Sequence, residues 1–183
     1  MLNLNPYWVA GFVDGEGCFH VSVLKHPEMS LKYQLLPEFV IVQHKRDVKL
    51  LLALKAFFGS GVVRTNHGDR LCLRIRKLDA LKKVCSFFRE YPLNSKKKED
   101  LEKFELVLNC IQNKSHLQKE GLFAIIQLVM TMNTQRRPAL LSVLEELKPL
   151  DKEMVHAHME TMGLRERNSL SGKRILPLTC ANE

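Results

Sequence analysis

The sequence lacks the features that mark disulfide-rich, zinc-binding, membrane-spanning and secreted proteins. Its five cysteines are odd in number and share no Cys-x-x-Cys spacing, which predicts a reducing compartment and no zinc site. The longest apolar segment, residues 122–132, contains Gln127 and is too short to span a bilayer. No charged leader followed by an apolar stretch opens the chain, so we expect neither secretion nor membrane attachment.

Acidic residues are too few to balance the basic ones. The 183 residues include 28 Lys+Arg and 20 Asp+Glu, a formal net charge of +8. A positive charge favours a polyanionic partner, because each neutralised phosphate releases condensed counterions. Charge alone does not separate DNA from RNA or from an acidic membrane surface, and a merely basic protein is an equally good interpretation. With 45% apolar and 26% charged residues, the composition is that of an ordinary globular domain.

Hydrophobic periodicity predicts two pairs of strands set among helices. In chain order we expect a helix at 7–13, strands at 18–23 and 33–43, a helix at 48–58, strands at 62–66 and 71–77, and helices at 79–89, 98–112, 121–132 and 138–147. Asn5 and Pro6 are suited to start the first helix, and Gly15 and Gly17 to end it. Pro37 favours an edge position or a bulge for the second strand.

This order of elements predicts an α+β fold, with one antiparallel sheet and helices packed on one face. We find no internal repeat. Beyond about Gly163 the sequence is polar and without pattern. We therefore expect a single domain at 1–163 and a loosely ordered tail at 164–183.

A glycine-containing segment follows Asn5 and Pro6 and occurs once. From Trp8 to Gly17 it reads Trp-Val-Ala-Gly-Phe-Val-Asp-Gly-Glu-Gly. Its part from Val9 to Gly17 resembles the LAGLIDADG signature of homing endonucleases and their maturase relatives. Gly15 stands for the second alanine of that signature and Glu16 for the more usual aspartate. The resemblance covers about residues 5–150 and implies an αββαββα core, a DNA-binding antiparallel sheet and extra C-terminal helices.

Gly11 and Gly15 are four residues apart and so share one helical face, across which two backbones can approach closely. Spacing alone is equally consistent with a helix contact inside one chain or with a cap. The resemblance favours a homodimer, because family members with one motif dimerise about a two-fold axis. The expected interface residues are Ala10, Gly11, Asp14 and Gly15.

Glu16 lies at the end of the motif helix, where the helix dipole disfavours a negative charge. In a dimer two such carboxylates would meet, and like charges at close range do not both stay ionised unaided. A divalent cation resolves both problems, and Mg²⁺ (or Mn²⁺) suits carboxylate and phosphate oxygens. We expect Glu16 and the backbone carbonyl of Gly15 to bind this ion, and Asp14 to stabilise the helix end. The alternative is a solvated glutamate after a helix.

The resemblance implies two further catalytic residues. Gln43 would order water near the scissile phosphate, and Lys96 would polarise water or stabilise developing charge, although Lys97 or Lys98 could take its place. Without the resemblance, Gln43 is an ordinary polar residue at a strand end and the lysines are a solvated charge cluster. Some relatives carry a basic residue four positions after the glutamine. Asp47 stands there in this chain, so Lys45 or Arg46 would have to supply that charge.

The polar face of the sheet is the expected reading surface, because a two-stranded ribbon fits the major groove of DNA. Arginines suit guanine, and Gln34 and Asn66 suit adenine. A solvated outer face is the alternative for any single residue. The expected DNA-binding residues are His20, Ser22, Gln34, Glu38, Arg64, Asn66, Arg74, Arg76, Lys45, Arg46, Lys97 and Lys98.

These features imply a sequence-specific DNA endonuclease that hydrolyses phosphodiester bonds in both strands of a long, pseudo-palindromic site. The resemblance implies that it leaves 3′ overhangs and promotes mobility of a host intron. The alternative is an RNA maturase that binds its group I intron and assists splicing. A DNA-binding regulator is less consistent with the sequence, which shows no added helix-turn-helix. The expected location is a chloroplast or mitochondrion for an organellar gene, and otherwise a microbial cytoplasm.

Overall fold

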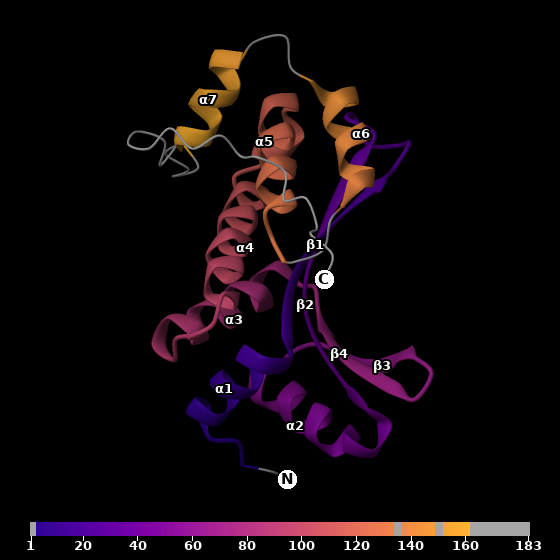
Figure 1. Ribbon diagram of the computed structural model, residues 1–183, viewed down its shortest axis with the longest axis vertical. Coiled ribbons are helices and arrows are strands. Elements are labelled where there is room, and N and C mark those ends of the chain that lie inside the picture. Colours follow the sequence, from indigo (N-terminus) through magenta and orange to yellow (C-terminus); the bar gives the residue numbers. More distant parts are fainter. Residues whose placement is uncertain (1–2, 134–136, 149–151, 162–183) are drawn as a thin grey trace, which may run out of the picture.

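A four-stranded antiparallel sheet forms the centre of the fold, here described from a computed structural model for residues 3–133, 137–148 and 152–161 (Figure 1). The strand order is β1-β2-β4-β3, so two hairpins join through their second strands. The strands are β1 (Gly17–Lys25), β2 (Tyr33–His44), β3 (Val62–His67) and β4 (Arg70–Ile75). The α+β class predicted from the sequence is confirmed.

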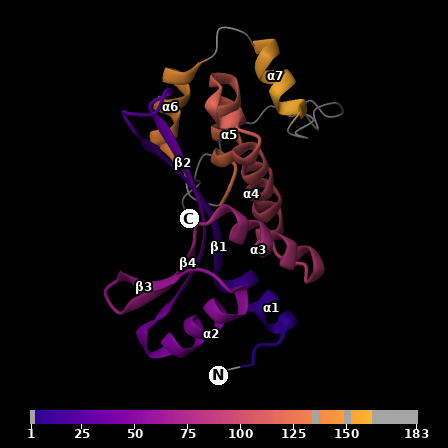
Figure 2. The ribbon, with the colours of Figure 1, turned by 180° about the vertical axis from the view of Figure 1, so that it is seen from behind.

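Helices α3, α4 and α5 lie on one side of strands β1 and β2, and the β3–β4 hairpin extends away on the other side in both views (Figure 2). The helical segments are α1 (Pro6–Glu16), η1 (Lys45–Asp47), α2 (Val48–Phe58), α3 (Leu78–Glu90), α4 (Lys97–Gln112), η2 (Ser115–Leu117), α5 (Lys119–Met130), α6 (Pro138–Leu147) and α7 (Lys152–Thr161). The predicted helices and strands are all present, with ends shifted by a few residues, whereas α7 was not predicted. The predicted tail at 164–183 lies outside the described residues.

Helix α1 begins as its sequence predicts but ends later. The side chain of Asn5 accepts hydrogen bonds from the backbone N–H groups of Tyr7 and Trp8, at 2.9 and 3.3 Å. Gly15 does not end the helix, which continues to Glu16. The chain turns into β1 at Gly17, where a Cβ would lie 2.6 Å from Val13 Cγ1 and 2.9 Å from its carbonyl oxygen. Only glycine fits this turn without a shift, and the turn fixes the position of the preceding glutamate.

The edge position or bulge predicted for the strand that holds Pro37 is wrong, because β2 is an interior strand with a regular register to β1. Pro37 is paired with Val21 of β1, while pairing of β2 with β4 begins only at Phe39. The carbonyl of Val21 points away from β2, toward Arg137. The Val21–Pro37 pair therefore forms no hydrogen bonds between the strands, and the missing N–H of Pro37 faces the side that β4 does not reach.

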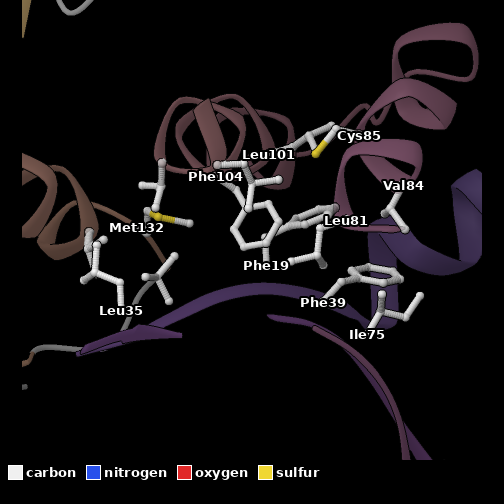
Figure 3. Close-up of a cluster of buried hydrophobic side chains, with 14 of the residues drawn as sticks. Phe19, Leu35, Phe39, Ile75, Leu81, Val84, Cys85, Leu101, Phe104 and Met132 are labelled. Atoms are coloured by element: carbon white, nitrogen blue, oxygen red, sulfur yellow. The ribbon is translucent and has the colours of Figure 1, made fainter. Parts of the chain in front are cut away.

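The core lies between the inner face of the sheet and helices α3 and α4 (Figure 3). Phe19 of β1 is fully buried, with its ring centroid 5.1 Å from Phe39 of β2 and 5.5 Å from Phe104 of α4. Burial alternates along β1, with odd-numbered residues inward, so the even-numbered residues share the outer face. The aromatic cluster thereby holds one face of the sheet against the helices.

The C-terminal helices brace the β1–β2 hairpin. The Tyr33 hydroxyl donates a hydrogen bond to the carboxylate of Glu146 in α6, and Lys25 Nζ lies 3.2 Å from the other oxygen of that carboxylate. Asn133, after α5, donates from its side chain to the carbonyl of Phe19 at 3.1 Å. Along the described part of the chain, no helix combines the length and apolar character needed to cross a bilayer.

Candidate active site

The exposed side of α1 is apolar and free of bulky contacts at its glycines. A Cβ at Gly11 or Gly15 would meet no atom within 4 Å in the part of the chain that the structure describes. Trp8 is 46% exposed, although its ring stacks on Phe12 with centroids 4.9 Å apart. Ala10, predicted for a dimer interface, is instead 6% exposed and packs in the protomer's own core. The open side of the helix thus consists of the two glycines and neighbouring aromatic rings, not of Ala10.

Asp14 fastens α1 to the chain before α4. Its carboxylate accepts hydrogen bonds from the backbone N–H groups of Asn94 and Ser95 and, at 2.6 Å, from the Ser95 hydroxyl. Burial alone would raise the pKa of Asp14, but these hydrogen bonds and nearby Lys97 outweigh it and hold the pKa below the usual value. This arrangement agrees with the structural role predicted for Asp14. Its oxygens are already engaged within the protomer.

Glu16 and Gln43 meet where α1 and β2 end. Gln43 Nε2 donates to Glu16 Oε2 at 3.2 Å, and both side chains line an open cavity of about 290 Å³. The other residues around this cavity are Val42, His44 and Arg70. Two residues that lie 27 apart in the sequence therefore come together as a carboxylate and an amide at one surface hollow.

Among the three lysines at the start of α4, Lys97 lies against the end of α1. Its Nζ donates to the carbonyls of Val13 and Gly15, at 3.0 and 3.2 Å. Lys96 and Lys98 are exposed. Burial lowers the pKa of Lys97, although the nearby acids Asp14 and Glu16 oppose that shift. The structure thus brings Lys97, and not the predicted Lys96, to the site.

The Gly15 carbonyl, predicted as a metal ligand, accepts the Lys97 hydrogen bond in this arrangement. Across the described ranges, no three His, Cys, Asp or Glu side chains gather in a way that could hold a metal ion. One protomer offers the exposed Glu16 carboxylate, and only one of its oxygens receives Gln43. This donor set fits Mg²⁺, which retains waters and takes few protein ligands, and it leaves room for ligands from a second protomer and from DNA.

The outer face of the sheet carries the residues predicted to read DNA. Strand register places His20 opposite Glu38, and Arg74 opposite Val62 and Val40. A second open cavity of about 310 Å³ lies at this face between β3 and β4. It is lined by Ser60, Gly61, Val62, Arg64, Arg74, Arg76 and Lys77. Four positive side chains therefore surround one hollow, as expected of a surface that contacts phosphates or guanines.

Glu38 departs from its predicted role as a base contact. It is 7% exposed, because two arginines cover its carboxylate. Arg76 Nε donates to Glu38 Oε2 at 2.9 Å. Arg74 Nε lies 3.3 Å from the same oxygen, but its N–H is not aligned for a hydrogen bond and the pair is an ion pair only. Glu38 therefore positions the arginines and has little surface of its own.

Arg137 lies at the β1 edge of this face, and it was not predicted from the sequence as a site residue. Its guanidinium donates to the carbonyl of Val21 at 2.9 Å and lies 3.0 Å from His20 Nδ1. The other ring nitrogen of His20 lies 3.2 Å from Ser22 Oγ. No local pattern links residues 116 positions apart, so only the packing of the C-terminal segment against β1 reveals this contact.

Lys45 and Arg46, predicted to contact DNA, both lie beside acids. Lys45 Nζ is 2.6 Å from Asp69 Oδ1, and Arg46 Nε is 3.4 Å from Asp47 Oδ2. These groups are largely exposed, so the ion pairs contribute little stability. They do reduce the charge that either side chain offers to DNA.

A glycine helix that ends in a carboxylate, set on an αββαββ sheet, is the architecture of the LAGLIDADG proteins. Residues 9–108 match the model of the family described as LAGLIDADG endonuclease. The chain therefore belongs to the LAGLIDADG endonuclease family.

Individual relatives agree with this membership. The crystal structure of the homing endonuclease I-TnaI is 53% identical, with a TM-score of 0.77 over 80% of this chain and 99% of that one. I-SmaMI bound to an uncleaved DNA target with calcium ions is 32% identical, with a TM-score of 0.75 over 78% of this chain and 49% of that one. A 50.9 kDa protein encoded in ND4 intron 1 of Podospora anserina is 35% identical over 119 residues, covering 63% of this chain and 26% of that protein. This chain spans 26–37% of the length of the first three curated relatives it matches.

Proposed function

We propose that the protein is a sequence-specific DNA endonuclease that cuts both strands of a long, pseudo-palindromic site as a homodimer. The observation that carries the proposal is the Glu16–Gln43 pair at the end of an open glycine-lined helix. The relatives support it, because I-SmaMI, which shares the fold, is described in complex with its DNA target.

The surface of α1 supports the proposed homodimer. Two copies of the helix could approach closely at Gly11 and Gly15, where an added Cβ would meet no atom of the described residues within 4 Å. Trp8 and Tyr7 are 46% and 73% exposed, and a partner would cover such aromatic surface. The coverage of 49% of I-SmaMI is consistent with one chain of this protein supplying half of a complete enzyme.

At the dimer axis each Glu16 would present a carboxylate, and the two together would hold Mg²⁺ with oxygens of the DNA backbone. The bound ion would supply positive charge to stabilise the leaving oxygen of the cut strand. Gln43 holds one Glu16 oxygen and keeps the carboxylate oriented. Lys97 places a positive charge at the carbonyl end of α1, which reduces the repulsion between the helix dipole and the glutamate.

The outer face of the sheet would read the target. Arg64, Arg74 and Arg76 surround one hollow and suit bidentate contacts to guanine. We further propose 3′ overhangs as the product, and intron mobility as the biological outcome in an organelle. The relative encoded in ND4 intron 1 supports an intron setting. The maturase alternative gains no support from these relatives, none of which is described as binding RNA.

The test begins with selection of a duplex from a randomised library by the wild-type protein. Wild type should cut the selected duplex with Mg²⁺ and only bind it with Ca²⁺, while Glu16→Gln should bind without cutting. Equal cutting by the two proteins rules out the assignment of Glu16.

Dimerisation is tested with Gly11→Leu and, as a matched control, Ser86→Leu on the exposed side of α3. Because a Cβ at Gly11 would meet no atom of the described residues within 4 Å, the variant should fold. Sedimentation should show a monomer for Gly11→Leu and a dimer for Ser86→Leu. A wild-type protein that is monomeric on DNA overturns the dimer.

A further inference from the structure

We propose that Arg70 holds the scissile phosphate against Glu16, and that it supplies the positive charge of the cutting site in place of Lys45 or Arg46. This inference rests on the proposed endonuclease function and assigns a further residue to it. Arg70 was absent from the residues that sequence analysis predicted for the site.

The cavity at Glu16 gives the first reason. Its lining among the described residues is Glu16, Val42, Gln43, His44 and Arg70, and of these Arg70 is the one permanently charged cation. A DNA phosphate entering this hollow would meet the Glu16 carboxylate, and two negative groups repel each other at close range. A guanidinium on the same wall offsets that repulsion and can donate two parallel hydrogen bonds to phosphate oxygens.

The charge on Arg70 is available, unlike that on its neighbours. Lys45 and Arg46 lie 2.6 and 3.4 Å from carboxylate oxygens. Among the described residues, no carboxylate lies within ion-pair distance of Arg70, whose side chain is exposed. Neither Lys45 nor Arg46 lines the cavity.

The sheet places Arg70 by backbone pairing. Arg70 is the first residue of β4 and lies directly opposite His44, the last residue of β2. Directly opposed residues of an antiparallel pair have Cβ atoms about 5 Å apart. The Lys45 N–H donates to the Asp69 carbonyl at 2.7 Å, next to the Lys45–Asp69 ion pair. The contacts between Lys45 and Asp69 thus hold the β3–β4 turn against the end of β2, and they fix the backbone position of Arg70.

The chemistry asked of Arg70 is electrostatic. During hydrolysis of a phosphodiester, negative charge grows on the phosphoryl oxygens and the leaving oxygen. A guanidinium beside this growing charge stabilises the transition state more than the bound substrate, so it accelerates the step without a matching gain in affinity. Loss of Arg70 should therefore lower the cleavage rate far more than the affinity.

The experiment measures single-turnover cleavage at saturating protein with Mg²⁺, and affinity with Ca²⁺, on the duplex selected by the wild type. The variants are Arg70→Ala, Arg70→Lys and Arg46→Ala, with Lys55→Ala on the exposed side of α2 as a control for net charge. Arg70→Ala should cut about 100-fold more slowly, with affinity within about threefold of wild type. Arg70→Lys should recover part of the rate, because lysine restores the charge but not the paired hydrogen bonds.

Three outcomes overturn the inference: an unchanged rate for Arg70→Ala, a comparable loss of rate in Arg46→Ala, or a loss of affinity that accounts for the whole loss of cleavage. The proposed function is tested separately in the same assay. If wild type does not cut with Mg²⁺, or if Glu16→Gln cuts as wild type does, the endonuclease assignment fails. Wild type that cuts while Arg70→Ala cuts equally well refutes Arg70 alone.

Discussion

The guanidinium of Arg137 lies 3.0 Å from Nδ1 of His20, a residue on the proposed reading face. Arg137 therefore determines which ring nitrogen of His20 carries the proton. Beside a permanent cation Nδ1 acts as an acceptor, which leaves the proton on the nitrogen near Ser22 Oγ. The Ser22 hydroxyl is then free to donate outward, to a base that offers an acceptor.

The first prediction concerns the titration of His20. Burial lowers the pKa of His20, the Arg137 charge lowers it further, and Glu38 opposes both. A histidine with a depressed pKa stays neutral in the folded protein while the unfolded chain gains a proton. The part of the stability that depends on His20 is therefore lost as pH falls below about 6.5. In Arg137→Ala the His20 pKa should rise, as seen by NMR titration of the ring protons. An unchanged titration would show that Arg137 does not act on His20.

The second prediction concerns the turn that positions Glu16. A Cβ at Gly17 would clash with Val13, so Gly17→Ala must move the end of α1. We expect cleavage of bound DNA to slow by about 100-fold, since displacements of about 1 Å have that effect. Gly61→Ala is a matched control, because its Cβ would be crowded to 2.8 Å but far along the chain from Glu16. It should lower stability and change affinity, and leave the cleavage rate of bound DNA intact. Equal rate losses in both variants would indicate a general effect of strain.

The third prediction concerns the arginines that Glu38 holds. Glu38→Gln removes the buried charge while keeping a similar shape, so Arg74 and Arg76 lose their fixed partner. Affinity for random duplex should rise, because one more positive charge is available to phosphates. Preference for the selected duplex should fall by about tenfold, since a bidentate arginine–guanine pair contributes about 1–3 kcal/mol of discrimination. Binding to both duplexes at several salt concentrations measures this. An unchanged preference would mean that Glu38 does not position the arginines for reading.

The fold was predictable because alternation and helix caps are local signals. Asn5 and Pro6 started α1 as expected, and hydrophobic alternation predicted all four strands to within a few residues. The Glu16–Gln43 pair followed from the motif and its resemblance. Each of these positions depends on residues close in the sequence or on a spacing within one known motif.

The remaining site residues could not be placed from the sequence, because their positions depend on tertiary contacts or on the residue at which a helix begins. Successive residues at a helix start point about 100° apart, so placing Lys97 rather than Lys96 at the site required the true start of α4. Alternation put Glu38 on the outer face, but only the register of β2 with β4 showed that arginines cover it. Arg70 entered the site through a cross-strand pairing that no sequence pattern specifies.

The last prediction concerns the contact that holds the far end of the β1–β2 hairpin to α6. The Glu146 carboxylate accepts hydrogen bonds from the Tyr33 hydroxyl and from Lys25. Burial and this contact raise the pKa of Tyr33 to about 12, and the same contact lowers the pKa of Glu146. Because the pKa of Tyr33 is higher in the folded chain than in the unfolded one, this contact stabilises the fold below pH 10, and the stabilisation is lost as pH rises toward 12. Because the pKa of Glu146 is lower in the folded chain than in the unfolded one, its stabilising effect is lost as pH falls below about 4.5.

The hairpin should therefore stay docked between about pH 5 and 10, and Tyr33→Phe should loosen it throughout that range. Limited proteolysis of the loop at residues 26–32 reports docking, with Lys25→Met as the variant that keeps the Tyr33 contact. Equal cleavage of that loop in wild type and Tyr33→Phe at pH 7 would mean that α6 holds the hairpin by apolar packing alone.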